Sequence, residues 1–285
     1  MSTEYKVSAA DIAKLREITG AGMSDCKKFL QEAMGDIPTA IELLRKNGAK
    51  ISAKRQDNAL NHGVAFSLVN ADHTKGLALL VGCETDFVAT GADLNDFTKQ
   101  IAELALAADV NTVDELLALP ASGGLKVADL LLDKVTALRE NIKIVSLKRV
   151  SGEFVHSYVH KSGQESKIAV VVALNQKGAA VKEAAHKLAL QTSGMHALVA
   201  QRSQLSAEMV ERERGLITEM TLENAKGKPQ DIIDKMVHGK MEKFFKDAVL
   251  MEQPYLFDDS KTVAQYLQSV SAGLQCIELV RLSLK

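Results

Sequence analysis

A pattern of two strands followed by a helix occurs twice in the chain, and it constrains the fold more than any other feature. In the first copy, alternating apolar residues at 64–68 precede a continuously apolar run at 77–81. Residues 154–159 and 168–174 repeat this order about 90 residues later. Alternation predicts a half-buried strand, and a continuous run predicts a strand covered on both faces. The repeat favours an internal duplication or two subdomains of one design.

Helical patterns follow both strand pairs. The first copy predicts a helix over about 94–108, after a loop at 84–93, and the second predicts a helix over 178–191. A further strand is predicted at 142–150, and we expect it to open the second copy. Separate strand and helix segments of this kind predict an α+β core of two similar subdomains.

Helices flank this core in the sequence. The first fifty-odd residues predict a compact bundle of three short helices, the first capped by Ser8 and the third ending near Gly48, with a polar linker at 49–58. Residues 206–248 predict an antiparallel helical hairpin that projects into solvent, broken by a Gly-Lys-Pro turn. Its first helix is expected to pack through Met209, Leu216, Ile217 and Met220, and its second through Ile233, Val237, Met241 and Phe244.

The predicted domain organisation follows from these segments. The boundaries are 1–55 for the bundle, 56–141 for the first core subdomain, 142–205 for the first part of the second, 206–248 for the hairpin and 249–285 for the closing part. The closing part predicts a short helix at 262–267 and a last strand at 274–282.

Charge and cysteine content exclude several classes of protein. Lys and Arg number 35 and Asp and Glu 36, so a net charge of −1 provides no global attraction to nucleic acid. No apolar run is long enough to span a membrane, and the first residues have no signal-peptide pattern. The cysteines, Cys26, Cys83 and Cys276, are odd in number and form no CxxC, which predicts a cytoplasmic protein without a metal or disulfide framework.

Signals for catalysis are weak. His156 and His160 are four residues apart in a strand pattern, which places them about 13 Å apart and makes a shared metal unfavourable. No phosphate-binding loop, dinucleotide fingerprint or nucleophile elbow occurs. We therefore predict no catalytic residue, metal site or cofactor.

Two segments carry features suited to recognition. In residues 15–23 a Gly-rich turn is expected to direct Met23 outward, although packing within the bundle is the common role of methionine. In residues 84–91 Phe87 stands next to a carboxylate after a buried strand, where an aromatic side chain either packs in the core or anchors a partner. The residues alone leave both alternatives open.

Together these two segments resemble the bacterial translation elongation factor Ts family. The resemblance rests on Leu15-Arg16 with Thr19-Gly20-Ala21-Gly22-Met23, on Asp25-Cys26-Lys27-Lys28 and on Thr85-Asp86-Phe87-Val88-Ala89, and it extends over essentially the whole chain. Members of this family are guanine-nucleotide exchange factors for elongation factor Tu and do not make or break covalent bonds. The first module then resembles a ubiquitin-associated-type bundle, and the hairpin a projecting coiled coil.

The resemblance implies roles for individual residues. The contact face on the nucleotide-binding domain of elongation factor Tu would be formed or supported by Leu15, Arg16, Gly20, Gly22 and Met23. The segment linked to dislocation of the partner's Mg²⁺ would comprise Thr85, Asp86, Phe87 and Val88, with Phe87 as a wedge. His160 matches a histidine near the partner interface. The implied partner is elongation factor Tu, without direct contact to nucleic acid or membrane, and a homodimer or a 2:2 complex stays open.

The chain departs from the family pattern in two places. Residues 90–97, Thr-Gly-Ala-Asp-Leu-Asn-Asp-Phe, replace the usual basic residue and its Asn or Asp, so the contacts flanking Phe87 are expected to differ. The chain ends at Lys285, where a C-terminal helical extension found in some members is expected to be short or absent.

Two alternative functions stay open. One is an enzyme that uses polar residues at strand ends, namely Glu84, Asp86, His156 and His160. The other is a scaffold that binds partners without nucleotide exchange.

Overall fold

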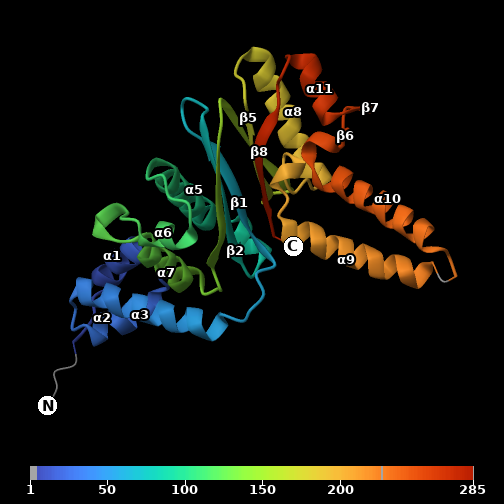
Figure 1. Cartoon of the computed structure of the whole chain (residues 1–285). Coiled ribbons are helices and arrows are strands. Elements are labelled where there is room, and N and C mark those ends of the chain that lie inside the picture. Colours follow the sequence, from blue (N-terminus) through green and yellow to red (C-terminus); the bar gives the residue numbers. More distant parts are fainter. Residues whose placement is uncertain (1–4, 226, 285) are drawn as a thin grey trace.

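The core has four layers, with two β-sheets face to face between two layers of helices (Figure 1). The computed structural model describes residues 5–225 and 227–284. The first sheet contains β1 (His62–Val69), β2 (Lys75–Cys83) and β3 (Lys143–Ser151), with β2 in the centre and both pairings antiparallel. This mixture of helices and antiparallel strands confirms the α+β class.

The second sheet has the same strand arrangement. It contains β4 (Phe154–Ser162), β5 (Glu165–Leu174) and β8 (Cys276–Ser283), with β5 in the centre. The two central strands, β2 and β5, are buried along almost their whole length. A central strand in a sheet that is covered on both faces has no side exposed to water, which explains the continuous apolar runs in the sequence.

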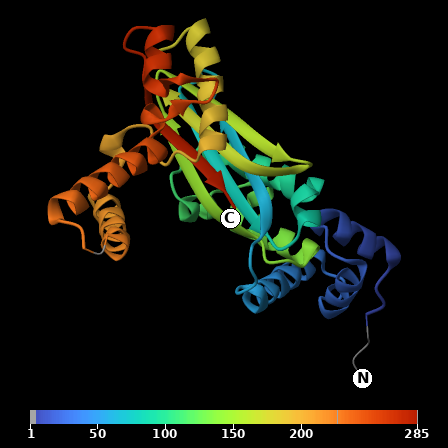
Figure 2. The same ribbon diagram turned by 90° about the vertical axis from the view of Figure 1, so that its right-hand side faces the viewer.

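Figure 2 shows the two sheets side by side, and small and branched side chains fill the space between them. Their buried set is Ala65, Ala78, Leu80, Val150, Val155, Ala169, Val171 and Ala173. Gly76 permits the sheets to approach closely, because a Cβ atom there would lie 2.5 Å from Cγ1 of Val171 and 2.7 Å from Cγ1 of Val155.

Helices cover the two outer faces of the core. The first sheet packs against α5 (Ala92–Ala107), α6 (Val113–Ala118) and α7 (Val127–Leu138), and the second against α8 (Ala179–Met195) and α11 (Val263–Val270). The core also contains short elements, namely α4 (Asp86–Thr90), β6 (Pro254–Tyr255), β7 (Asp258–Thr262) and the 3₁₀ turns Ser122–Gly124, Arg202–Gln204 and Leu250–Glu252. The small hairpin β6–β7 was absent from the sequence prediction.

The strand predicted at 142–150 forms, but its predicted place is wrong. It is β3, which pairs with β2 through Leu79–Leu147 and Val81–Ile144, so it closes the first sheet and does not open the second copy. Strand alternation identifies the two faces of a strand but not its neighbour, because pairing joins segments that are far apart in the chain. Each sheet consequently consists of a strand pair and a third strand that returns after intervening helices.

The N-terminal bundle consists of α1 (Ala9–Thr19), α2 (Met23–Glu32) and α3 (Ile37–Arg55) around a small apolar core. The N-cap predicted at Ser8 is present, with its hydroxyl accepting from the Asp11 N–H. The predicted end near Gly48 is wrong, because α3 continues to Arg55 and much of the expected linker is helical.

Contacts with α7 account for the extra turns of α3. The backbone of Gly48 lies so close to α7 that a Cβ atom would stand 2.2 Å from Thr136 Oγ1 and 2.8 Å from the Leu132 carbonyl oxygen. The Arg45 guanidinium pairs with Asp133 at 2.9 and 3.1 Å. Glycine disfavours a helix interior by roughly 1 kcal/mol, and here tertiary packing overrides that preference.

Gly48→Ala is expected to destabilise the protein by about 1–2 kcal/mol, because overpacking against α7 exceeds the gain in helix propensity. The matched control is Gly239→Ala in α10 (Gln230–Ala248), where a Cβ atom meets nothing within 4 Å. That change is expected to stabilise by about 0.5–1 kcal/mol. Urea unfolding of both variants measures the difference, and equal effects at the two glycines would contradict the packing argument.

The predicted hairpin is formed by α9 (Ala207–Asn224) and α10, and it projects from the core in both ribbon views (Figures 1 and 2). The apolar stripe of α10 packs as predicted. The stripe of α9 is only partly right, since Ile217 is buried but Met209, Leu216 and Met220 are exposed. Each helix of a two-helix hairpin has one neighbour, so a single narrow face is covered.

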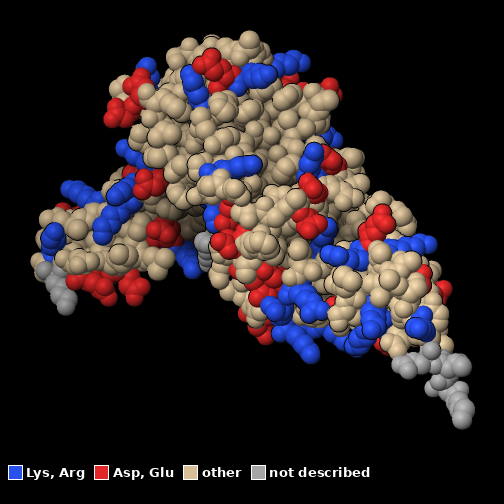
Figure 3. Space-filling model, turned by 180° about the vertical axis from the view of Figure 1, so that it is seen from behind, with Lys and Arg blue, Asp and Glu red and all other residues tan. Residues whose placement is uncertain are grey.

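On the face seen in Figure 3, basic and acidic side chains are mixed over the bundle at lower right and the hairpin at lower left. The middle of the upper part of the core carries few charges on this face, whereas basic and acidic side chains lie along its top edge. Within residues 5–225 and 227–284, no helix combines the length and apolarity needed to span a membrane.

Candidate functional site

Residues 86–90 form a short helix, α4, where the sequence predicted a loop. The Thr85 hydroxyl caps it by accepting from the Val88 N–H at 3.3 Å, and an Asp86 carboxylate oxygen accepts from the Phe87 N–H at 2.8 Å. At the other end, the Thr90 hydroxyl donates to the Asp86 carbonyl at 2.9 Å. These side chains satisfy backbone groups locally, which permits a single helical turn to persist outside the sheet.

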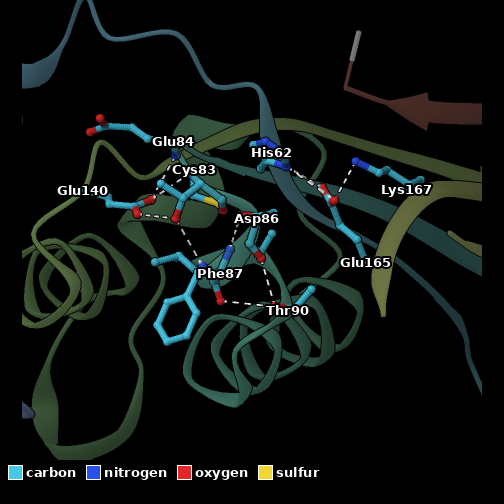
Figure 4. A network of polar contacts seen from close by, with 12 residues as sticks. His62, Cys83, Glu84, Asp86, Phe87, Thr90, Glu140, Glu165 and Lys167 are labelled. Carbon is cyan, nitrogen blue, oxygen red and sulfur yellow. Dashed lines mark hydrogen bonds and ion pairs between the residues drawn. The ribbon is translucent and has the colours of Figure 1, made fainter. Parts of the chain in front are cut away.

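Phe87 is presented to solvent by this turn. Its side chain is 84% exposed, more than any other large apolar residue in the described ranges, whereas Val88 and Ala89 on the same turn are buried against the core. The ring points away from the polar contacts around it (Figure 4). Packing therefore explains Val88 but not Phe87. An aromatic ring left in water contributes almost nothing to folding stability, and an exposed aromatic side chain of this kind is typical of a residue that a partner covers.

Glu84, immediately before this turn, connects it to the bundle. Its carboxylate accepts from Arg55 at 2.8 and 2.9 Å, from Asn58 at 2.8 Å and from the Asn141 N–H at 2.6 Å. Burial acts to raise the pKa of Glu84, but the hydrogen bonds from Asn141 and Arg55 outweigh it and lower the pKa below its usual value. The last turn of α3 is thus tied to the segment that carries Phe87.

The Gly-rich turn of the bundle combines buried and exposed residues. Leu15 is fully buried, and Gly20 adopts the left-handed conformation with φ +67°, its N–H donating to the Arg16 carbonyl at 2.8 Å. Arg16, Gly22 and Met23 are exposed, and Met23 is 62% exposed as expected for an outward side chain. Leu15 and Gly20 therefore shape the turn, while the other three residues face solvent.

Ile18 is a surface residue that the sequence analysis missed. The spacing of Ile12, Leu15 and Ile18 in the sequence predicts one apolar helix face, but Ile18 is 55% exposed and Thr19 takes the buried position instead. The Thr19 hydroxyl donates to the Leu15 carbonyl, which satisfies a polar group inside the bundle. The sequence carries no signal for this exposure, because an apolar residue at helical spacing is typical of a buried face.

A groove lies beside the Gly-rich turn of the bundle. Ile18 and Gly20 line it from the bundle, and Asp93 and Lys134 line it from α5 and α7. Residues 84–90 are not among its lining residues, and Asp93, in the first turn of α5, is the lining residue nearest to α4 in the sequence.

His160 lies near the end of β4 and is exposed. Its Nδ1 is 3.2 Å from the Tyr158 hydroxyl, and it lines an apolar groove with Leu190, Leu256 and Phe257. His62, at the start of β1, lies 3.4 Å from Glu165 at the start of β5, so these strand ends are adjacent (Figure 4). Residue 160 pairs with β5 near that end, which places it at the same end of the core as Phe87.

His156 faces α8 rather than sharing a site with His160. Its Nε2 lies 3.2 Å from Nδ1 of His186, and the two rings meet edge to face. Burial, and then the neighbouring His186 and His73, lower the pKa of His156 to about 4.

This histidine makes stability pH-dependent. Because its pKa is lower in the folded state than the usual value of about 6.5, the unfolded chain binds more protons between pH 6.5 and 4. The free energy of unfolding is therefore expected to fall by about 2 kcal/mol as the pH drops through this window, allowing for partial exposure. Urea unfolding at pH 7 and 4.5 measures the change. The free energy of unfolding should fall less for His156→Gln than for the parent, and an equal fall would show that His156 is not the group responsible.

Metal-ligating side chains and thiols are dispersed in the part of the chain that the structure describes. No cluster of three or more His, Cys, Asp or Glu side chains there is placed to hold a metal ion. All three cysteines are buried, and burial raises the pKa of the Cys26 thiol and raises that of Cys83 to about 12. These thiols pack as small apolar groups.

Known proteins resemble this chain over almost its whole length. The family model described as Elongation factor TS matches residues 84–285. The chain belongs to the elongation factor Ts family. Elongation factor Ts of Flavobacterium psychrophilum is 38% identical over 94% of this chain and 95% of its own length, and that of Christiangramia forsetii is 36% identical over 98% and 99%. Elongation factor Ts of Bifidobacterium longum strain DJO10A is 39% identical over 94% of both chains.

Membership in the elongation factor Ts family confirms the resemblance identified from the sequence. The matched region includes Phe87 and His160. The bundle precedes it, and the relatives cover that part through alignments of 94% or more of the chain.

Proposed function

We propose that this protein is a guanine-nucleotide exchange factor that binds elongation factor Tu in its GDP form and accelerates GDP release, so that GTP can bind during translation elongation. Family membership supports the partner, and the observation that carries the proposal is the exposed Phe87 ring on a short, anchored helix. The process changes affinities and involves no covalent step.

Phe87 acts as a wedge in this proposal. Burying its ring in a cleft between partner helices gains roughly 2–3 kcal/mol, which is available to shift the elements that hold Mg²⁺ against the GDP phosphates. Mg²⁺ neutralises the diphosphate, so its displacement weakens nucleotide binding. Within the same segment Thr85 and Asp86 hold the turn, and Val88 anchors it to the core.

The bundle docks on the nucleotide-binding domain of elongation factor Tu. Ile18 and Met23 supply exposed apolar surface, and Arg16 and Gly22 lie exposed beside them. Leu15 and Gly20 act indirectly, by fixing the backbone of the turn. An apolar centre with a polar margin is the usual composition of a protein–protein contact.

His160 contacts a neighbouring domain of the partner. The groove that it lines with Leu256 and Phe257 is apolar, and both of these side chains are about half exposed. Such a groove accepts an apolar side chain of the partner, with the imidazole as a polar group at its margin.

Linkage sets the thermodynamic requirement. The protein must bind nucleotide-free elongation factor Tu more tightly than the GDP form, and GDP must weaken the complex by the same factor. A wedge that fits only the rearranged nucleotide site satisfies this requirement, because its burial is available in one state of the partner and not in the other.

The remaining assignments follow from the same proposal. The bundle (1–55) and the hairpin (206–248) are separate modules on a two-part core, and the first core part extends through β3 to Ser151. The protein acts in the cytoplasm, without direct contact to nucleic acid. Whether it functions as one copy or in a 2:2 complex is decided by light scattering of the complex.

Release of a fluorescent GDP analogue from elongation factor Tu tests the proposal. With the protein at one-tenth of the concentration of elongation factor Tu and an excess of unlabelled GDP, release should be faster and all of the bound analogue should leave. Binding without faster release would leave only a scaffold function. An unchanged rate without binding would refute both.

A further inference from the structure

We propose that Glu140 is a positioning residue that fixes the direction of Phe87. The inference rests on the proposed exchange function for its effect on activity. Glu140 lies between the end of α7 and β3, more than fifty residues from Phe87 in the sequence, and the fold brings its carboxylate to the segment before α4 (Figure 4).

The carboxylate of Glu140 accepts three hydrogen bonds from two adjacent residues. Its Oε2 accepts from the Glu84 N–H at 3.0 Å and from the Thr85 N–H at 3.2 Å, and its Oε1 accepts from the Thr85 hydroxyl at 2.5 Å. Hydrogen bonds to an ionised acceptor are roughly twice as strong as neutral ones. One side chain thus holds both the backbone and the side chain of the helix cap.

The N–H groups of Glu84 and Thr85 belong to neither a strand nor a helix. β2 ends at Cys83, whose last partner in the first sheet is His62, and α4 begins only at Asp86. The backbone of Glu84 and Thr85 therefore lies between a sheet and a helix. Glu140 supplies the acceptors that the next strand residues would otherwise provide.

The contact is reciprocal, which makes it specific. The Glu84 carboxylate accepts from the Asn141 N–H at 2.6 Å while Glu140 accepts from the Glu84 N–H at 3.0 Å. Two chain segments consequently hold each other through their side chains and backbones. Arg55 fixes the far side of Glu84, so the junction is braced from the bundle as well.

The consequence for Phe87 follows from the length of α4. A helix of five residues is too short to be stable in water without external contacts. Val88 and Ala89 pack its inner side against the core, but the direction in which Phe87 points also depends on where the helix begins. Glu140 determines that starting point through Thr85, and so it orients the wedge without touching the partner.

Glu140→Gln tests this role. The amide keeps the shape of the side chain but has one acceptor oxygen, and its NH₂ group faces N–H donors. We expect the maximal rate of stimulated GDP release to fall about tenfold, with a change of less than about threefold in the concentration for half-maximal effect. The bundle and the His160 groove supply most of the affinity, and the substitution leaves them unchanged.

A double variant separates positioning from general structure. If Glu140 acts through Phe87, Glu140→Gln should add almost nothing in a Phe87→Ala background. An equal further loss in that background would show an effect on the fold or on other contacts, and would overturn the proposal. Glu103→Gln on α5, an exposed glutamate paired only with Lys99 at 3.9 Å, is the control for loss of one charge and should leave the rate unchanged.

A second readout needs no partner. The chain contains no tryptophan, so Phe87→Trp creates a single fluorescent reporter at the wedge. Time-resolved anisotropy of that indole should show faster and wider local motion when Glu140→Gln is added, and no change when Glu103→Gln is added. An unchanged anisotropy decay with Glu140→Gln would overturn the positioning role.

The two readouts distinguish failure of this inference from failure of the proposed function. If the parent protein does not accelerate GDP release, the function fails, and the anisotropy still decides whether Glu140 orients residue 87. If the parent is active and Glu140→Gln releases GDP at the parent rate, the inference fails alone. Should Glu140→Gln not fold, Glu140→Asp keeps the charge but is one methylene shorter, and the same two measurements apply.

Discussion

Phe87→Ala is expected to slow the stimulated release of GDP from elongation factor Tu by about 30-fold or more. The ring is fully available to a partner, and loss of a central aromatic anchor costs about 2 kcal/mol or more, which corresponds to that factor. Stopped-flow release of a fluorescent GDP analogue at saturating protein measures the effect. Because Phe87 is exposed, its removal should leave the free energy of unfolding almost unchanged.

The control for this prediction is Leu222→Ala on α9. Leu222 is 48% exposed and lies on the projecting hairpin, so it tests whether any exposed apolar side chain matters for exchange. Its removal should change the rate less than twofold or so. A Phe87→Ala protein that is folded and releases GDP at the parent rate would refute the wedge assignment.

The combined change Ile18→Ser and Met23→Ser is expected to weaken binding to elongation factor Tu by about 30-fold. Each side chain loses roughly 1 kcal/mol of apolar burial on docking, so that the pair loses about 2 kcal/mol. Both side chains are mostly exposed in the free protein, and their replacement should not destabilise the bundle. Titration calorimetry with nucleotide-free elongation factor Tu measures the dissociation constant.

Met34→Ser is the matched control within the same bundle. Met34 is 61% exposed, almost as exposed as Met23, but it follows the end of α2 rather than the Gly-rich turn. Its replacement should leave the dissociation constant within about twofold of the parent. If Met34→Ser weakened binding as much as the combined change at Ile18 and Met23, docking would depend on the bundle as a whole and not on the turn.

The sequence predicted two recognition segments, but it did not separate the residues that face solvent from those that support them. Leu15 and Met23 belong to one motif, yet the first is buried and the second is exposed. Val88 and Phe87 differ in the same way on α4. Motif matching assigns a role to a segment, whereas exposure depends on how that segment packs on elements elsewhere in the chain.

Non-local contacts account for the errors in the fold prediction. The poor helix propensity of glycine predicts an end of α3 near Gly48, but contact with α7 overrides that preference. β3 was assigned to the second copy because it precedes β4 directly in the sequence, although it pairs with β2. Local propensities amount to about 1 kcal/mol or less per residue, so one packed interface is enough to override them.

The sequence by itself determined most of the long strands and helices, the α+β class and the family. Periodicity and turn residues are local properties, and burial of one face fixes them wherever the element lies. Only the tertiary structure decided the neighbour of β3, the exposure of Ile18 and the contact of Glu140 with Thr85. Those features join residues that are distant along the chain, and their energies arise only when packing brings the partners together.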